Sequence, residues 1–262
     1  MKHENEILHP FVGKYATWVN ADLELGATAE QIAAAEADLG FSLPPSLRSF
    51  YTICNGITLP TPSEEIRLLS LEEAVFFFHL LTDFYKGVLP YIPEHFQFFP
   101  FTDFNNSNHY AVCCTEPLTG RIVHLLHDDF AYLAFRSIRS FLSTLWCVVY
   151  HEYHHDLLED WCDFAQSNPA RTLQDDAAGM ELLRIASSLE TSLEWAHLWR
   201  KWAAVLIAPE RAREFWDIIS TGDENCRRVV VERLQHIEIP SAAVVLEQYQ
   251  WSMLKLLPAS QS

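Results

Sequence analysis

The sequence has 262 residues, is 49% hydrophobic and 13% aromatic, and carries a formal net charge of −17 at pH 7. This composition excludes an intrinsically disordered chain. The longest apolar runs, residues 146–150 and 203–208, are far shorter than the roughly 20 residues of a membrane-spanning helix. The polar start of the chain and the 6 cysteines without CxxC spacing predict a cytoplasmic protein whose thiols stay reduced.

The negative charge is concentrated in the first part of the chain. Residues 1–167 carry 22 acidic and 8 basic side chains, whereas residues 168–262 carry 13 and 10. Such a field repels nucleic acid and anionic membranes and attracts basic proteins. We therefore expect a basic protein partner, no nucleic acid and no membrane. A general solubilising role of the charge is the alternative.

The first predicted elements are helices. Apolar spacing indicates an amphipathic stretch over residues 7–22 and a clearer helix over residues 28–39. Thr28 and Gln31 form a capping box at the start of this helix, and Gly40 favours a left-handed stop after it.

A second helix is expected to follow immediately. Pro44 and Pro45 suit its first turn, and Asn55-Gly56 suits its end. The apolar residues that this helix turns towards the core are Leu47, Phe50, Tyr51 and Cys54.

Strand signals begin after a proline-containing loop. Residues 66–69 read as a short strand, and Ser70 with Glu73 forms a capping box for a helix to about residue 85. Three further strands are predicted over residues 96–101, 110–115 and 121–126, with 116–120 as a hairpin loop. A long helix over residues 137–164 closes this part.

The rest of the chain reads as helical. The predicted helices cover residues 173–189, 192–207, 209–220, 224–235 and 241–257. Capping-box spacing precedes three of them, at Thr172/Asp175, Thr191/Glu194 and Thr221/Glu224. Trp195, Trp199 and Trp202 stand at helical spacing and indicate packing. The sequence thus predicts an α+β domain over residues 1–165, with a small, mainly antiparallel sheet packed by helices, and an all-α domain over residues 166–262.

Residues 36–44 followed by residues 50–56 resemble the characteristic pattern of the SUKH superfamily. In that pattern an acidic helix ends in Gly, an apolar-x-Leu-Pro entry follows, and the next helix closes on Asn-Gly. The matching positions, which we call the signature residues, are Ile32, Glu36, Leu39, Gly40, Leu43, Pro44, Phe50, Asn55 and Gly56. Ile57 departs from the pattern at a position often taken by a second Gly, and the tail after Asn168 has no counterpart in the minimal domain.

The resemblance implies a binding protein. The superfamily includes bacterial immunity proteins, which bind and neutralise a cognate toxin, often a nuclease, and fungal regulators of cell-wall synthesis. The signature residues describe a scaffold, so function must reside in the variable surface. Candidate acidic contacts are Glu64, Glu65, Glu72, Glu73, Asp128 and Asp129, and candidate aromatic anchors are Phe130 and Tyr132.

A competing motif lies in the predicted long helix. His151, Glu152 and His155 form HExxH, in which two imidazoles one turn apart share a zinc ion and the glutamate activates its water. The residues considered as a third ligand are Glu159, Asp160, Asp163 and Glu181. The adjacent His154 and the surrounding acids equally suit a solvated helix face.

The sequence therefore favours a protein that is not an enzyme, has no cofactor and neutralises a basic toxin by stoichiometric occlusion. A regulatory adaptor without a toxin partner is the first alternative. A zinc metalloprotease is the second. The sequence leaves the oligomeric state open.

Overall fold

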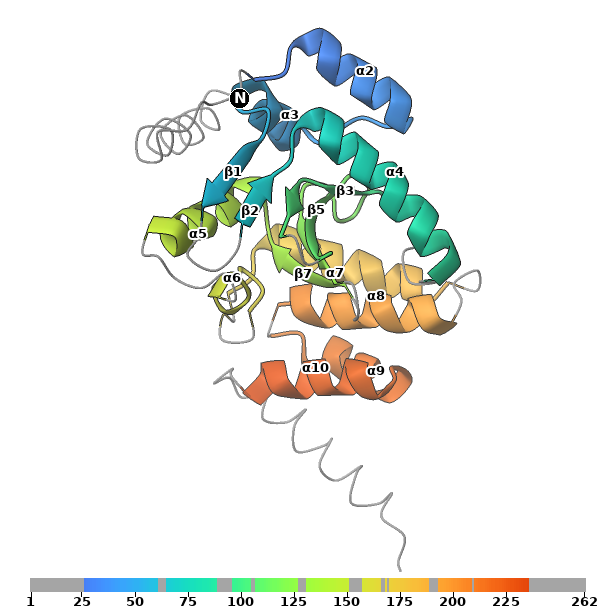
Figure 1. Ribbon diagram of the computed structural model, residues 1–262. Helices are drawn as coiled ribbons and strands as arrows, with labels where there is room; N and C mark the ends of the chain where they lie inside the picture. Colours follow the sequence, from blue (N-terminus) through green and yellow to red (C-terminus); the bar gives the residue numbers. More distant parts are fainter. Residues whose placement is uncertain are drawn as a thin grey trace, which may run out of the picture. The chain divides into compact units, whose positions relative to one another are not determined.

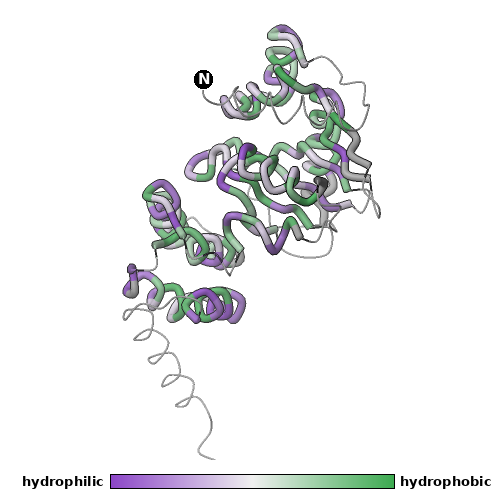
Figure 2. Tube along the Cα trace, turned by 90° about the vertical axis from the view of Figure 1, so that its left-hand side faces the viewer, coloured by the Kyte–Doolittle hydropathy of each residue, from purple (hydrophilic) through white to green (hydrophobic). Residues whose placement is uncertain are grey.

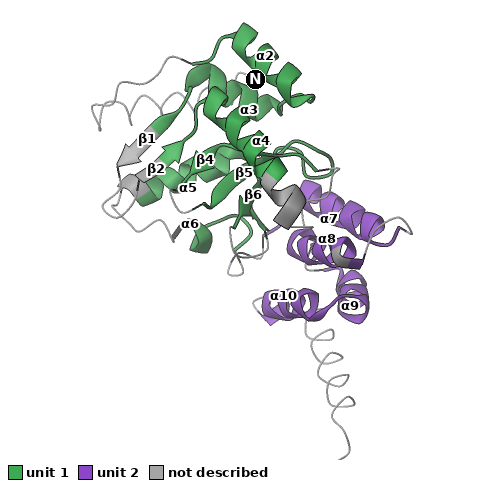
Figure 3. Cartoon of the chain, turned by 45° about the vertical axis from the view of Figure 1, so that its right-hand side comes forward, with its two compact units in different colours: residues 1–165 green, residues 166–262 purple. Residues whose placement is uncertain are grey.

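A computed structural model describes residues 26–60, 65–88, 96–104, 107–126, 131–150, 157–165, 168, 170–188, 193–208 and 210–235. Two compact units divide the chain, residues 1–165 and 166–262 (Figure 3). The first mixes strands and helices and the second is helical, which confirms the predicted fold class. Independent folding of each unit stays a prediction. The helices predicted over residues 7–22 and 241–257 lie outside the described residues.

The first two described helices follow their predicted boundaries. Helix α2 (Ala29–Leu39) begins at a capping box, in which Thr28 Oγ1 accepts from Gln31 N–H at 3.2 Å and Gln31 Oε1 accepts from Thr28 N–H at 2.8 Å. Gly40, with φ 76°, ends it. Helix α3 (Pro45–Ile53) follows. Its buried side chains are those predicted, Leu47, Phe50 and Tyr51, with Cys54 just beyond its end.

One antiparallel sheet has the strand order β1-β2-β4. Its strands are β1 (Ile57–Pro60), β2 (Glu65–Leu68) and β4 (Thr102–Asp103). The sequence predicted β2 but interpreted β1 as a loop, because proline is unfavourable within a strand. Ile57 pairs with Leu68, and β1 lies at the sheet edge, where Pro60 is tolerated because it needs no donor on its outer side.

A second antiparallel sheet has the order β3-β5-β6-β7. Its strands are β3 (Phe98–Pro100), β5 (His109–Cys113), β6 (Ile122–Leu125) and β7 (Tyr132–Phe135). Strand β7 was missed, because a four-residue apolar run cannot be assigned by periodicity alone. Its pairing with β6, in which Val123 faces Leu133, makes it a strand.

The described part of the first unit contains three further helices, α4 (Leu71–Val88), α5 (Ile138–Tyr150) and α6 (Leu157–Asp160) (Figure 1). Helix α4 packs on β3 and α2, while α5 packs on α3 and β7. The core between them is rich in aromatic rings, and the ring of Phe141 lies 5.0 Å from both Phe101 and Tyr110. Edge-to-face packing of this kind adds to the free energy gained by burial.

The single helix predicted over residues 137–164 is wrong in its last part. After α6, residues 161–164 form a turn. The Asp163 carboxylate accepts hydrogen bonds from the backbone N–H of Arg136 at 2.8 Å and from its guanidinium at 3.1 Å. These bonds attach the turn to the residue after β7 and take the place of helical bonds.

The second unit is built from four described helices. They are α7 (Leu173–Ala186), α8 (Leu193–Leu206), α9 (Ala212–Thr221) and α10 (Glu224–Gln235). Helix α8 packs against α7 and α10, and Trp199 and Trp202 on it are buried, as predicted. Figure 2 shows hydrophilic and hydrophobic residues alternating along the helices of both units, the pattern of helices that bury one face.

The start of α10 corrects the predicted cap at Thr221. That residue is the last of α9, and its hydroxyl donates to the Asp217 carbonyl at 2.6 Å. Asp223 caps α10 instead, since its Oδ1 accepts from Cys226 N–H at 2.9 Å. The box at Thr172 and Asp175 is confirmed, and the one at Thr191 lies outside the described residues.

None of the described helices is long and apolar enough to cross a membrane. All six cysteines are thiols rather than disulfides, and four of them are buried.

Candidate functional site

The polar signature residues connect elements of the first unit. Glu36 Oε1, on α2, accepts from Leu43 N–H at 2.7 Å and from Arg48 Nε at 2.6 Å, which attaches α2 to α3 and the loop before it. Asn55 Oδ1 accepts from Leu71 N–H at 2.9 Å at the start of α4. The Asn55 bond attaches the end of α3 to the first residue of α4.

The remaining signature residues supply core and backbone geometry. The apolar members are all buried, namely Ile32, Leu39, Leu43, Pro44 and Phe50. Gly56 has φ 107°, and a Cβ there would lie 2.8 Å from the backbone nitrogen of Ser70. The signature residues therefore build the scaffold of the first unit.

A mixed apolar and acidic stripe runs along the solvent side of α4. Phe76 and Leu80 have 62% and 49% of their surface exposed. Glu72 and Asp83 are also exposed, and His79 lies beside Leu80. The spacing of four, four and three residues places the side chains at 72, 76, 80 and 83 on one side of a helix. We call this stripe the α4 outer face, defined as Glu72, Phe76, His79, Leu80 and Asp83.

The opposite side of α4 is fixed in the core. Leu71 and Ala74 are buried. The ring of Phe78 lies 5.3 Å from Phe41 and 6.4 Å from Phe99, and Phe77 lies 5.2 Å from His109. The α4 outer face is therefore presented by a helix whose position is set by packing, which keeps its exposed rings in a defined arrangement.

The charges around the α4 outer face are predominantly negative. His79 Nε2 lies 3.3 Å from the Asp38 carboxylate on α2, which adds an acid beside the stripe. Glu73, by contrast, serves the fold. It accepts from Ser70 N–H at 3.0 Å and pairs with Arg67. Burial acts to raise the pKa of the Glu73 carboxyl, but the hydrogen bonds from Ser70 and the charge of Arg67 outweigh it, and the pKa is lowered.

Residues 26–144, which include α2, α3, α4 and both sheets, match the model of the SMI1 / KNR4 family (SUKH-1). This segment is a SUKH domain. The resemblance inferred from the signature residues is thereby confirmed. No curated protein matches the chain.

Most of the acidic contacts predicted for the SUKH domain cannot be placed on one surface. Glu64, Asp128 and Asp129 lie outside the described residues, as does Phe130. Glu65 begins β2, and its side chain is likewise not described.

Tyr132, a candidate aromatic anchor, is partly buried rather than fully exposed. Its hydroxyl lies 2.7 Å from His124 Nδ1, and its ring packs against the core of the SUKH domain. The His124 ring in turn stacks on Tyr110 at 4.2 Å. Pairing of β7 with β6 brings these side chains together, and the sequence showed no sign of that pairing.

The sequence analysis missed Phe76 and Leu80, although a signal for them was present. Four apolar residues at 76–78 and 80 cover more of a helix circumference than one buried stripe can hold. The acids at 72 and 83 share a side with residues 76 and 80, so the excess apolar residues had to lie on the polar side. Plotting the acidic residues as well as the apolar ones on a helical wheel would have shown that Phe76 and Leu80 lie on the polar side.

The HExxH residues His151, Glu152 and His155 lie outside the described residues, so the zinc-protease hypothesis stays a prediction. Three of the four acids considered as a third ligand already have partners, and the first of them, Glu159, has Oε1 3.4 Å from His124 Nδ1. Asp163 pairs with Arg136, and Glu181 pairs with Arg184 at 2.6 Å in the second unit. Recruiting either carboxylate to zinc would break an existing ion pair.

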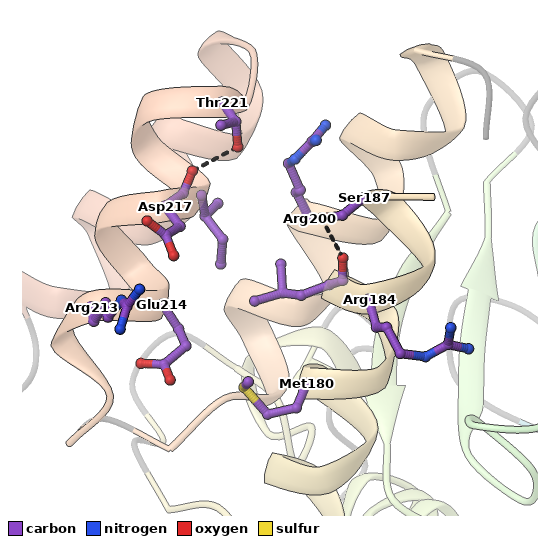
Figure 4. A pocket seen from close by; sticks show the side chains of 10 residues that line it. Met180, Arg184, Ser187, Arg200, Arg213, Glu214, Asp217 and Thr221 are labelled. Carbon is purple, nitrogen blue, oxygen red and sulfur yellow. Dashed lines mark hydrogen bonds between the residues drawn. The ribbon is translucent and has the colours of Figure 1, made fainter. Parts of the chain in front are cut away.

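The second unit contains a pocket of about 500 Å³ between α7, α8 and α9 (Figure 4). Leu183 and Ile218 supply apolar lining, and the charged side chains in the lining are Arg184, Arg200, Arg213, Glu214 and Asp217. Among the described residues, Arg200 Nη1 is a buried donor with no hydrogen-bond partner. Glu214 lies 3.4 Å from Arg211. One unsatisfied donor beside an apolar wall suits a water molecule or a small polar molecule rather than a macromolecule.

Proposed function

We propose that the SUKH domain binds a basic protein through the α4 outer face, and that this partner is a cognate toxin neutralised by stoichiometric occlusion. The proposed activity is binding without catalysis and without a cofactor. The observation that carries the proposal is the adjacent exposure of Phe76 and Leu80, at 62% and 49%, on a helix fixed by packing.

Three physical arguments support an interface at this stripe. Large exposed apolar side chains that lie next to each other mark interaction sites, and buried aromatic anchors dominate binding free energy. Acids around such anchors steer a basic partner into register. A net charge of −17 extends this attraction over the molecule. A toxin that acts on nucleic acid presents a basic surface of the complementary kind.

The test is co-expression with the product of the adjacent gene, followed by co-purification and an assay of that product's activity. We expect a one-to-one complex in which the toxin is inactive. The double variant Phe76→Asp/Leu80→Asp should weaken binding by more than about 30-fold, since an anchor residue contributes at least about 2 kcal/mol. Its circular dichroism spectrum should be unchanged, because both side chains are solvent-exposed.

Leu173, which is 90% exposed on α7, provides the matched control. Leu173→Asp combined with Leu193→Asp, at a leucine that is 70% exposed on α8, adds the same two negative charges at accessible apolar positions outside the SUKH domain, and this pair should leave binding unchanged. Equal losses in both variants would exclude a specific role for the α4 outer face. A stable complex whose partner remains fully active would favour the regulatory adaptor over the immunity protein.

A further inference from the structure

Three side chains of metal-ligand type converge in the second unit. His197 lies on α8, Asp223 lies in the link between α9 and α10, and Cys226 lies in the first turn of α10. One imidazole nitrogen, one carboxylate oxygen and the thiol sulfur all lie within 4.8 Å of one another. Nitrogen, oxygen and sulfur donors of these types are the ligands that zinc uses in proteins.

Hydrogen bonds hold these three residues together. Asp223 Oδ1 accepts from Cys226 N–H at 2.9 Å as the cap of α10. Asp223 N–H donates to His197 Nδ1 at 3.1 Å, and the Cys226 thiol donates to the His197 carbonyl at 3.1 Å. Because Nδ1 is an acceptor in this network, its lone pair points towards the α9–α10 link.

The close approach of the link to the thiol depends on a glycine. A Cβ at Gly222 would lie 2.5 Å from Cys226 Cβ and 3.2 Å from its Sγ. Gly222 is buried, and its N–H donates to the Ile218 carbonyl at 2.8 Å. The end of α9 therefore packs directly against the Cys226 thiol, and the His197 imidazole contacts the same region from α8.

The charge state of this group depends on whether a cation is present. Burial, together with the hydrogen bond and charge of Asp223, raises the pKa of the Cys226 thiol to about 12. Burial also acts to raise the pKa of the Asp223 carboxyl, but hydrogen bonds from Cys226 and the nearby His197 lower it overall. Without a cation the thiol is protonated, 1% exposed and unreactive. A divalent cation displaces the thiol proton and is balanced by the resulting thiolate and carboxylate.

We propose that His197, Asp223 and Cys226 bind a thiophilic divalent cation, for which zinc is the best fit, with water as the fourth ligand. Zinc–ligand bonds of about 2.0–2.3 Å place the donors of a tetrahedral site roughly 3.3–3.8 Å apart, so the three atoms approach by at most about 1.5 Å. The metal bond replaces the hydrogen bond that His197 Nδ1 accepts. Thiolate and imidazole ligands disfavour magnesium and calcium, which prefer oxygen.

The consequence of such a site is a cross-link between α8 and α10. An ion that binds the folded unit more tightly than the unfolded chain stabilises the fold by mass action. His197 and Asp223 are partly exposed, which leaves an approach for the ion and for its water ligand. The site belongs to the second unit and is independent of the function proposed for the SUKH domain.

Cobalt titration of the reduced full-length chain tests the site, because a cobalt–thiolate bond has a charge-transfer absorption in the near ultraviolet. We expect this band to saturate at one ion per chain and zinc to displace the cobalt. His197→Ala should weaken affinity by more than about 100-fold, since loss of an outer-shell partner alone costs about 10–100-fold. Cys226→Ser should abolish the band.

Three further variants distinguish this site from the other thiols and imidazoles of the chain. Asp223→Asn keeps a good helix cap but removes the charge, so it should fold normally and bind more weakly. Cys147→Ser, at an exposed cysteine, and His151→Ala/His155→Ala, at the HExxH motif, should retain the band. Absence of a thiolate band in the unmodified chain, or its survival in Cys226→Ser, would overturn the proposal. So would its loss in the HExxH variant.

Discussion

At the scale of single residues, Gly40 and Gly56 both have a positive φ angle, but replacing them should destabilise the fold by different amounts because their surroundings differ. Both have positive φ angles, 76° and 107°, which side chains with a Cβ disfavour. An added Cβ at Gly40 would have no atom within 4 Å, whereas one at Gly56 would meet the backbone of Ser70 and Leu68. Gly56 lies between α3 and β1, next to the start of α4. Glycine is therefore required there for two reasons: the positive φ angle and the lack of space for a Cβ.

We expect Gly40→Ala to lower the free energy of unfolding by about 1–2 kcal/mol, the cost of a left-handed residue. Gly56→Ala should lower it by roughly 2–4 kcal/mol, because strain and a backbone clash add. Denaturant unfolding followed by tryptophan fluorescence measures both. Equal losses would mean that the approach of Gly56 to Ser70 is relieved by a small backbone shift.

At the scale of elements, the tertiary structure determines which residue caps a helix and which side of a helix is buried. Thr172 and Thr221 look alike in sequence, each with an acid three residues later. In the structure Thr172 caps α7, whereas Thr221 ends α9 and the cap of α10 falls to Asp223. Helix α4 shows the same dependence on context, since its apolar residues are divided between the core and the α4 outer face.

Thr172→Ala should lower the free energy of unfolding by about 1 kcal/mol, because it removes the hydroxyl that donates to the Asp175 carboxylate and accepts from Asp175 N–H. Thr221→Ala, which removes the same hydroxyl from an exposed position, should change it by less than about 0.5 kcal/mol. Hydrogen exchange of the α7 amides in the full chain locates the effect. Faster exchange of the α10 amides in Thr221→Ala would contradict the assignment of the α10 cap to Asp223.

At the scale of the whole molecule, charge is the dominant property. The chain carries 35 acidic against 18 basic residues, and most of the excess lies in residues 1–167, which include the SUKH domain. Repulsion among these acids opposes compaction, and they attract a basic partner over distances longer than any single contact. In the complex proposed above, the α4 outer face supplies the apolar anchors within this field, so that electrostatic steering and the final contact would involve the same surface.

The association rate of the complex should consequently fall by about tenfold or more between roughly 10 mM and 150 mM salt, as screening shortens the reach of the field. Stopped-flow mixing with the purified partner measures it. Glu72→Lys/Asp83→Lys should slow association at low salt and flatten the salt dependence. A rate that does not respond to salt would remove electrostatic steering from the mechanism while leaving the apolar anchors in place.

Much of the local structure was predictable because its causes lie within a few residues. The capping boxes at Thr28 and Ser70, the left-handed stop at Gly40 and the buried side of α3 all follow from contacts inside one or two helical turns. The signature residues differ, since Glu36 and Asn55 bond to residues 12 and 16 positions away, and the SUKH domain was identified from their pattern in the sequence and not from local causes.

The tertiary structure decided what depends on distant partners. Strand β1 exists because β2 pairs with it, and β7 because β6 does. The exposure of Phe76 and Leu80 depends on which side of α4 meets the core. His197 and Cys226 stand 29 residues apart and meet only when α8 packs on α10. Such contacts could not be predicted from the sequence of either segment alone. Hydrogen bonds and packing between remote segments leave no periodic pattern in the segments that make them.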